Sequence, residues 1–183
     1  MCGYFPCRGM QTFVLGGGCF WCIDAVYRQF EGIETSVCGY TGGLTLNPTY
    51  QQVCSGMTGH VEVVKVEFDE TVIPAEVVLD IFFSSHNPTS WDQQGADRGS
   101  QYRSALYYSS PEQKQVFQQA LERASAWWDQ PIVTVLEPLG DFYEAEDYHQ
   151  NYYARNPYQG YCAAVINPKL AAARKRYGMF LKN

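Results

Sequence analysis

The chain has 183 residues, 46% of them hydrophobic and 17% charged, and a formal net charge of −6; this excludes an intrinsically disordered chain and fits one domain with a buried core. Its basic residues are scattered apart from Arg174, Lys175 and Arg176, which we interpret as the solvated face of a last helix and not as a nucleic-acid site. No apolar run approaches the roughly 18 residues of a membrane span, and the first eight residues lack the basic start and apolar stretch of a signal peptide.

Hydrophobic periodicity predicts an alternation of strands and helices. The expected elements are, in chain order, a strand at 11–15, a helix at 19–30, strands at 33–39 and 60–68, a helix at 74–86, a strand at 104–108, a helix at 111–128, a strand at 132–137 and a last helix from 168. A turn around Tyr50 and a polar loop at 87–103 lie between them. Ser110 and Pro111 have the form of a helix start with proline at the first helical position.

The order of the elements through residue 108 is strand, helix, strand, strand, helix, strand. This is the split βαβ pattern of ferredoxin-like folds. We therefore predict an α+β sandwich, in which helices pack on an antiparallel or mixed sheet, with a C-terminal helical extension over about residues 163–183. Residues 1–10 are expected to form a flexible N-terminal segment.

Cysteines are the most informative residue type in the chain. They stand at positions 2, 7, 19, 22, 38, 54 and 162. Their number is odd and the chain is large for a disulfide scaffold, so thiols that stay reduced, with a few in redox chemistry, fit better. We expect Cys2, Cys7, Cys38 and Cys54 to be buried or incidental thiols.

Cys19 follows three glycines and stands at the start of a predicted helix. The glycines let the backbone turn tightly, and the N–H groups and dipole at a helix N-terminus favour a thiolate and lower the pKa of the thiol. This combination makes Cys19 a candidate nucleophile, and the alternative is a small buried hydrophobe. Phe20 and Trp21 come next and are either core anchors or an apolar wall beside the thiol.

Cys22 lies one helical turn after Cys19, at a spacing that permits a disulfide. Redox motifs and zinc sites both use a Cys-x-x-Cys pair. A zinc site needs two more ligands, and the remaining cysteines and histidines are isolated. Redox chemistry is therefore favoured over zinc.

Glu62 stands out in the strand at 60–68. It shares one face with Val64, Val66 and Phe68, so it points to the core if they do. A buried carboxyl has a raised pKa and can donate a proton near neutral pH. The alternative is that Glu62 lies at a frayed strand end and faces solvent.

Several ordered segments together resemble the A-type peptide methionine sulfoxide reductases. They are residues 17–21 (GGCFW), 39–43 (GYTGG), 47–50 (NPTY), 53–56 (VCSG), 59–62 (GHVE), 94–104 (QGADRGSQYRS) and 145–150 (AEDYHQ). The resemblance extends from about Thr12 to Cys162. It implies a single catalytic domain over residues 1–183.

The resemblance assigns a role to each residue of the expected site. It implies that the nucleophile is Cys19 and the general acid is Glu62. The oxygen-binding tyrosines would be Tyr50 and Tyr102, and Asp97 would belong to the hydrogen-bond network of the site. The aromatics around the substrate methyl group would be Phe20 and Trp21. Many family members have glycine in place of Cys22 and resolve the oxidised nucleophile with cysteines in a C-terminal tail. Cys22 is preferred here by proximity, with Cys162 or a relay through both as alternatives.

The activity implied by this resemblance is reduction of methionine S-sulfoxide, free or in proteins, in three chemical stages. The thiolate attacks, a sulfenic acid and then a disulfide form, and an external dithiol, thioredoxin, reduces the disulfide. No metal or organic cofactor is expected, and no nucleic-acid or membrane partner. We expect a cytoplasmic monomer, with an organelle as the alternative location. The rival functions are a thioredoxin-like disulfide oxidoreductase and a zinc-binding interaction module.

Overall fold

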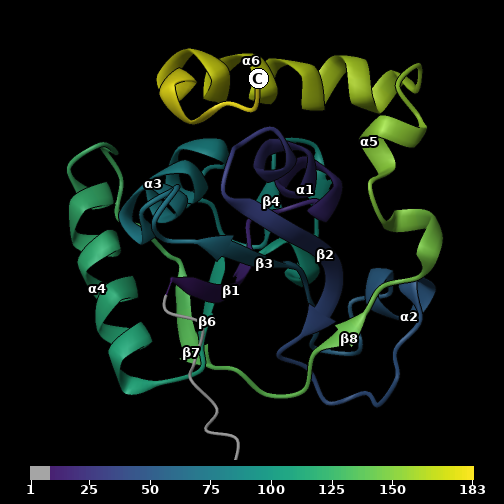
Figure 1. The fold of residues 1–183 in the computed structure, drawn as a ribbon. Coiled ribbons are helices and arrows are strands. Elements are labelled where there is room, and N and C mark those ends of the chain that lie inside the picture. Colours follow the sequence, from purple (N-terminus) through teal and green to yellow (C-terminus); the bar gives the residue numbers. More distant parts are fainter. Residues whose placement is uncertain (1–8) are drawn as a thin grey trace, which may run out of the picture.

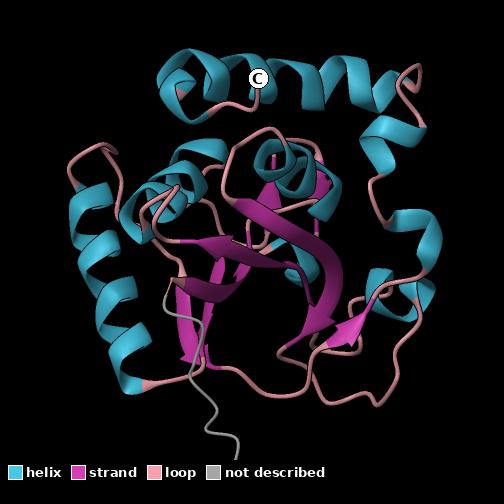
Figure 2. Cartoon of the chain, viewed as in Figure 1, coloured by secondary structure: helices cyan, strands magenta, loops and turns pink. Residues whose placement is uncertain are grey.

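The computed structural model describes residues 9–183 and shows helices packed on a mixed sheet (Figures 1 and 2), which confirms the predicted α+β class. The strands are β1 (Met10–Gly16), β2 (Ile33–Thr41), β3 (Val61–Asp69), β4 (Gln93–Gln94), β5 (Asp97–Arg98), β6 (Ala105–Tyr108), β7 (Val135–Pro138) and β8 (Tyr143–Glu144). The α-helices are α1 (Phe20–Arg28), α2 (Tyr50–Cys54), α3 (Ala75–Ser85), α4 (Pro111–Ser125), α5 (Tyr152–Arg155) and α6 (Asn167–Arg176).

Six strands form the main sheet in the order β7-β6-β1-β3-β2-β8. Strands β6 and β7 run parallel, and the other neighbouring pairs are antiparallel. Val64 in the middle of β3 faces Leu15 of β1 on one side and Cys38 of β2 on the other. The strands that precede and follow the Cys19 turn are therefore tied into the centre of the sheet.

Both faces of the sheet are covered, but by different structures. On the helix side, the Phe13 ring packs edge to face on Phe68 and Phe117, with centroids 4.8 and 5.0 Å away. On the opposite face, a second apolar cluster that includes Val63 packs against Phe142 from the loop before β8. The side chains of β3 are consequently buried on both sides of the sheet over much of its length.

The region expected to be a turn at Tyr50 is a short helix, α2, that begins at that residue. Thr49 caps it: its hydroxyl accepts from the Gln52 amide (3.2 Å), and the Gln52 side chain accepts from the Thr49 amide (2.9 Å). This reciprocal capping box stabilises a helix too short to show periodicity. The polar loop at 87–103 likewise contains structure, the β4–β5 hairpin and a 3-10 turn.

Two expected boundaries are wrong. Helix α4 ends at Ser125 rather than near 128, because the next amides bond to carbonyls three residues back (2.9 Å for Trp127 to Ala124) and close the helix in a tight turn. Strand β7 begins at Val135 rather than at 132, where parallel pairing with Ala105 starts. Pairing with β6 sets this boundary, so the local sequence alone does not predict where the strand begins.

The described chain starts close to a strand and ends in a mainly helical segment. Residues 1–8 of the expected flexible segment lie outside the described residues, while Met10 already pairs with Asp69 as the first residue of β1, so the expectation is wrong for Met10. At the other end, a π-helical turn (Cys162–Ile166) runs directly into α6, which lies across α1 and α3 (Figure 1). Among residues 9–183, no helix combines the length and hydrophobicity needed to cross a membrane.

Candidate active site

The glycine turn between β1 and α1 places Cys19 at the N-terminal end of α1. Strand β1 ends at Gly16, and Cys19 is the residue immediately before the first residue of the helix. Gly18 has a φ of 88°, and a Cβ atom there would lie 2.7 Å from Cγ of Gln94. Glycine is therefore required both by the backbone conformation and by the space beside the loop that carries Gln94.

The Cys19 thiol is partly buried. Burial, the neighbouring Cys22 thiol and the charge of Glu62 raise the pKa of Cys19 well above its usual value. The lowered pKa expected from the helix N-terminus is wrong for this arrangement, because the first amide of α1, that of Phe20, donates to Glu62 Oε1 (3.1 Å) and desolvation outweighs the helix dipole. Burial therefore disfavours the thiolate form of Cys19 in this structure.

Glu62 lies on the helix side of β3 and is 1% exposed, as the alternation along the strand predicts. Burial raises the pKa of Glu62 to about 8, although the hydrogen bond from the Phe20 amide acts in the opposite direction. At neutral pH the carboxyl is mostly protonated. The Glu62 carboxyl is thus bonded to the amide of the residue that follows Cys19.

Cys22 follows Cys19 by one turn of α1, its amide donates to the Cys19 carbonyl (3.1 Å), and its sulfur lies 3.5 Å from the Tyr161 hydroxyl. The neighbouring Cys19 thiol, followed by the charge of Lys169, lowers the pKa of Cys22 to about 7 against the effect of burial. Cys162 is fully buried at the start of the π-helical turn, and burial raises its pKa. The structure therefore places Cys22 directly beside the backbone of the candidate nucleophile.

The two candidate oxygen-binding tyrosines and the aspartate gather around Glu62. Burial is the main cause that raises the pKa of Tyr50 and of Tyr102, and the charge of Glu62 acts on both. Both phenols are therefore protonated donors. Asp97, in β5, accepts a hydrogen bond from the Tyr161 hydroxyl (2.7 Å), and its charge raises the pKa of Glu62 and Tyr102.

Phe20 and Trp21 occupy different depths. Phe20 is 1% exposed and packs with its ring centroid 5.0 Å from that of His149. Trp21 is partly exposed, stacks on Tyr152 at 3.7 Å and donates its indole N–H to His149 Nδ1 (3.0 Å). The buried histidine thereby fixes the orientation of the Trp21 ring.

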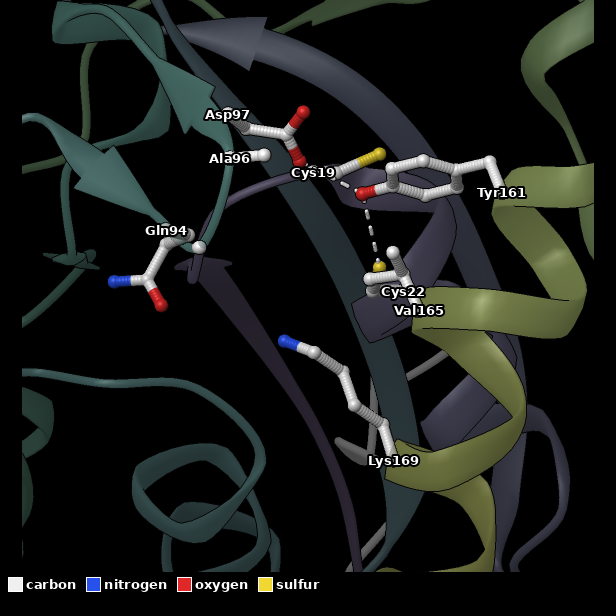
Figure 3. A pocket seen from close by; sticks show the side chains of 9 residues that line it. Cys19, Cys22, Gln94, Ala96, Asp97, Tyr161, Val165 and Lys169 are labelled. Atoms are coloured by element: carbon white, nitrogen blue, oxygen red, sulfur yellow. Dashed lines mark hydrogen bonds between the residues drawn. The ribbon is translucent and has the colours of Figure 1, made fainter.

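A cavity of about 220 Å³ opens beside the two thiols (Figure 3). Its wall consists of Cys19 and Cys22, of residues 94–97, and of Tyr161, Val165 and Lys169 from the C-terminal segment. Asp97 also belongs to this wall. The predicted nucleophile, its neighbouring thiol and the predicted aspartate thus share one cavity.

Sequence reasoning gave no role to the segment at 145–150, although it belongs to the motifs. Glu146 accepts hydrogen bonds from the Tyr40 hydroxyl and the Tyr50 amide, both at 3.0 Å. The Gln150 side chain bonds to both backbone groups of Cys38, at 2.9 and 3.0 Å. The signal available in the sequence was a run of polar residues without helix or strand periodicity, which is typical of a segment held by side-chain contacts.

The other thiols have no assigned chemistry. Cys38 is buried and Cys54 is exposed, while Cys2 and Cys7 lie outside the described residues. All five cysteines in residues 9–183 are free. In that same range, no three His, Cys, Asp or Glu side chains are grouped as a metal would require, so the zinc alternative finds no ligand set there.

Two neighbouring thiols at a helix start, with a buried carboxyl bonded to the first helical amide, define a thiol-dependent oxidoreductase. The family model described as peptide methionine sulfoxide reductase matches residues 11–179. The chain belongs to this family, as the resemblance of its motifs predicts.

Relatives with this name match nearly the full chain. The peptide methionine sulfoxide reductase MsrA of Paenarthrobacter aurescens is 59% identical over 172 residues, which are 94% of this chain and 99% of the relative. That of Leptospira borgpetersenii is 53% identical over 161 residues, 88% of this chain and 92% of the relative.

Solved structures agree. Mxr1 from Saccharomyces cerevisiae in reduced form has a TM-score of 0.79 and 34% identity, with 86% of this chain and 91% of that chain covered. Methionine sulfoxide reductase A of Corynebacterium diphtheriae has a TM-score of 0.75 and 33% identity, with 84% and 78% covered. A structure of Mxr1 in complex with Trx2 is also similar, with a TM-score of 0.57, 25% identity, and 83% and 90% covered.

Proposed function

We propose that this reductase uses Cys19 to remove the oxygen from the S epimer of methionine sulfoxide, free or within proteins, and so repairs oxidised proteins. One observation carries the proposal: the Cys19 thiol lines the cavity, while the Glu62 carboxyl is bonded to the amide of the next residue. The choice of epimer rests on the A-type motifs, since each epimer has its own enzyme. Family membership favours this function over a thioredoxin-like disulfide oxidoreductase or a zinc-binding module.

The first step has to assist the departure of an oxygen that leaves poorly as an oxide. The hydroxyls of Tyr50 and Tyr102 and the protonated carboxyl of Glu62 bind the oxygen, and Asp97 supports their hydrogen-bond network. The Cys19 sulfur attacks and the oxygen passes to it. The proton that Cys19 loses replaces the one that Glu62 donates, so methionine and a Cys19 sulfenic acid form without net change in protons.

The methyl group of the substrate needs an apolar wall. Trp21 supplies the accessible face of this wall and Phe20 lies deeper, at its base. The hydrogen bond to His149 (3.0 Å) supports the role of Trp21, because it keeps the ring in one orientation.

In the second step, the Cys22 sulfur attacks the sulfenic sulfur of Cys19. The S–O bond breaks, the hydroxyl takes up a proton and leaves as water, and a disulfide forms. The position of Cys22 one helical turn from Cys19, on the wall of the same cavity, supports it in this role. Thioredoxin then reduces the disulfide, a role consistent with the Trx2 complex of Mxr1. The cycle uses no metal or organic cofactor.

Serine variants of the two candidate resolving cysteines should behave differently. Cys22→Ser is expected to release a single methionine per enzyme and then stop when thioredoxin is the reductant, because the Cys19 sulfenic acid has no partner thiol. Cys162→Ser should continue to cycle. Methionine is measured in a burst assay and again at steady state. Cycling by Cys22→Ser together with arrest of Cys162→Ser would assign the resolving role to Cys162.

The activity itself is tested with the separate S and R epimers of a methionine sulfoxide and dithiothreitol as reductant. Methionine should form from the S epimer only. Turnover of the R epimer alone would overturn the assignment to the A type. Reduction of insulin disulfides without sulfoxide turnover would instead support the thioredoxin-like alternative.

The same proposal includes the finer organisation of the chain. The order β6-β1-β3-β2, with antiparallel neighbours, supports a ferredoxin-like split βαβ unit within one catalytic domain over residues 1–183. We place this monomer in the cytoplasm, because a dithiol that thioredoxin recycles works in a reducing compartment.

A further inference from the structure

The C-terminal segment covers the two thiols with side chains spaced four residues apart. Tyr161, Val165 and Lys169 all line the cavity (Figure 3). Tyr161 immediately precedes the π-helical turn, Val165 lies within it, and Lys169 lies in α6. Residues at this spacing share one side of a helix. One side of the C-terminal segment is therefore part of the redox site.

Lys169 is fixed within this wall. Its ammonium group donates a hydrogen bond to the backbone carbonyl of Ser85 at the end of α3 (3.0 Å), and the side chain is partly buried. An ammonium has three N–H donors, so two remain for the cavity. The same charge lowers the pKa of Cys22.

Cys22 is surrounded by groups from several elements. The titratable groups that act on it or respond to its charge are Cys19 from α1, Glu62 from β3, Asp97 from β5, and Tyr161, Cys162 and Lys169 from the C-terminal segment. Within the described chain, Lys169 is the cation of this set. Lys169 therefore supplies the positive charge that offsets a negative charge on the Cys22 sulfur, in addition to the Tyr161 hydroxyl at 3.5 Å.

The two sulfurs also differ in accessibility. Cys22 is 1% exposed and the Tyr161 hydroxyl lies 3.5 Å from its sulfur, whereas Cys19 is partly exposed. In thiol–disulfide exchange, the accessible sulfur is attacked and the sulfur with the more stable thiolate leaves. By both criteria, the Cys19 sulfur is the one attacked and the Cys22 sulfur is the one that leaves.

We propose that Lys169 is a positioning residue that makes Cys22 the leaving sulfur during recycling, so that the dithiol reductant becomes attached to Cys19. The inference rests on the proposed Cys19–Cys22 disulfide. A reductant thiolate forms a bond with the Cys19 sulfur, the Cys19–Cys22 bond breaks, and its electron pair leaves on Cys22 beside Lys169. The second reductant thiolate then displaces Cys19; the reductant ends as a disulfide, and both enzyme sulfurs take up protons.

The point of attachment is tested with a thioredoxin variant that lacks its second active-site cysteine. Mixed with the oxidised enzyme, it should remain linked to Cys19, as peptide mass spectrometry would show. Attachment to Cys22 would overturn the inference. Oxidised enzyme without a Cys19–Cys22 disulfide would contradict the proposed resolving step, and mass spectrometry before mixing separates the two outcomes.

The role of Lys169 is tested with Lys169→Met. In a Cys19→Ser background, loss of the charge should raise the pKa of Cys22 by about one unit, so that alkylation by iodoacetamide at neutral pH slows by up to about tenfold. Lys169→Arg should restore the pH profile, and Lys175→Met, on the exposed side of α6, should leave it unchanged. A profile that Lys169→Met does not shift would overturn the role, since a purely structural lysine would not move it.

Discussion

Replacing Cys19 by serine is expected to abolish methionine release, by about 10⁴-fold or more, because a serine oxygen is a much weaker nucleophile than sulfur and does not accept oxygen from a sulfoxide. The fold should survive the change. Serine is similar in size and is a favoured residue before a helix, and the Cys19 side chain makes no capping hydrogen bond in α1. Methionine release with dithiothreitol and thermal unfolding measure the two effects separately.

This variant also decides between two adjacent thiols. Judged by ionisation alone, Cys22 is the better nucleophile, since the pKa of its thiol is lowered to about 7 whereas that of Cys19 is raised. Judged by accessibility, the order is reversed, because Cys22 is 1% exposed. Cys54→Ser removes an exposed thiol and should keep full turnover. Turnover by Cys19→Ser, together with its loss in Cys22→Ser, would assign the attack to Cys22.

Local signals in the sequence were sufficient to predict the positions of Cys19 before a helix and of Glu62 on the buried face of a strand. The glycines before Cys19 predicted a tight turn into a helix, and α1 begins directly after it. Alternation in the strand that contains Glu62 predicted its face, and its neighbours on that face, Val64 and Val66, are buried. Both arguments need only a few consecutive residues, because a turn and a pleat are properties of the local backbone.

The surroundings of the two thiols could not be predicted in this way. The pKa of Cys19 depends on burial by segments distant in sequence, and the sulfur of Cys22 meets a tyrosine 139 residues away. The alternation argument also treated only one face of β3 as apolar, yet Val63 is buried on the other face by the loop that carries Phe142. Tertiary packing determines the pKa of Cys19, the contact of Cys22 and the burial of Val63, and sequence periodicity does not predict that packing.

Replacing Glu62 by glutamine is expected to slow the first chemical step by about 10²- to 10⁴-fold, because the amide has no acidic proton for the departing oxygen. The side chain keeps its shape and an oxygen that can accept the Phe20 amide, as the carboxyl does now. Single-turnover formation of methionine isolates this step from recycling. Glu67→Gln, in the same strand and partly exposed, is the matched control and should retain the full rate.

The pH dependence distinguishes a proton donor from a group that only binds. Burial raises the pKa of Glu62 to about 8, so the acid form is present below this value and is lost as the pH rises through it. The single-turnover rate of the wild-type protein should therefore fall above about pH 8. Ionisation of Cys19 acts in the opposite direction, since more thiolate forms as the pH rises. A falling limb that disappears in Glu62→Gln consequently identifies the carboxyl, whereas a variant that keeps both the rate and the limb would exclude Glu62 as the proton donor.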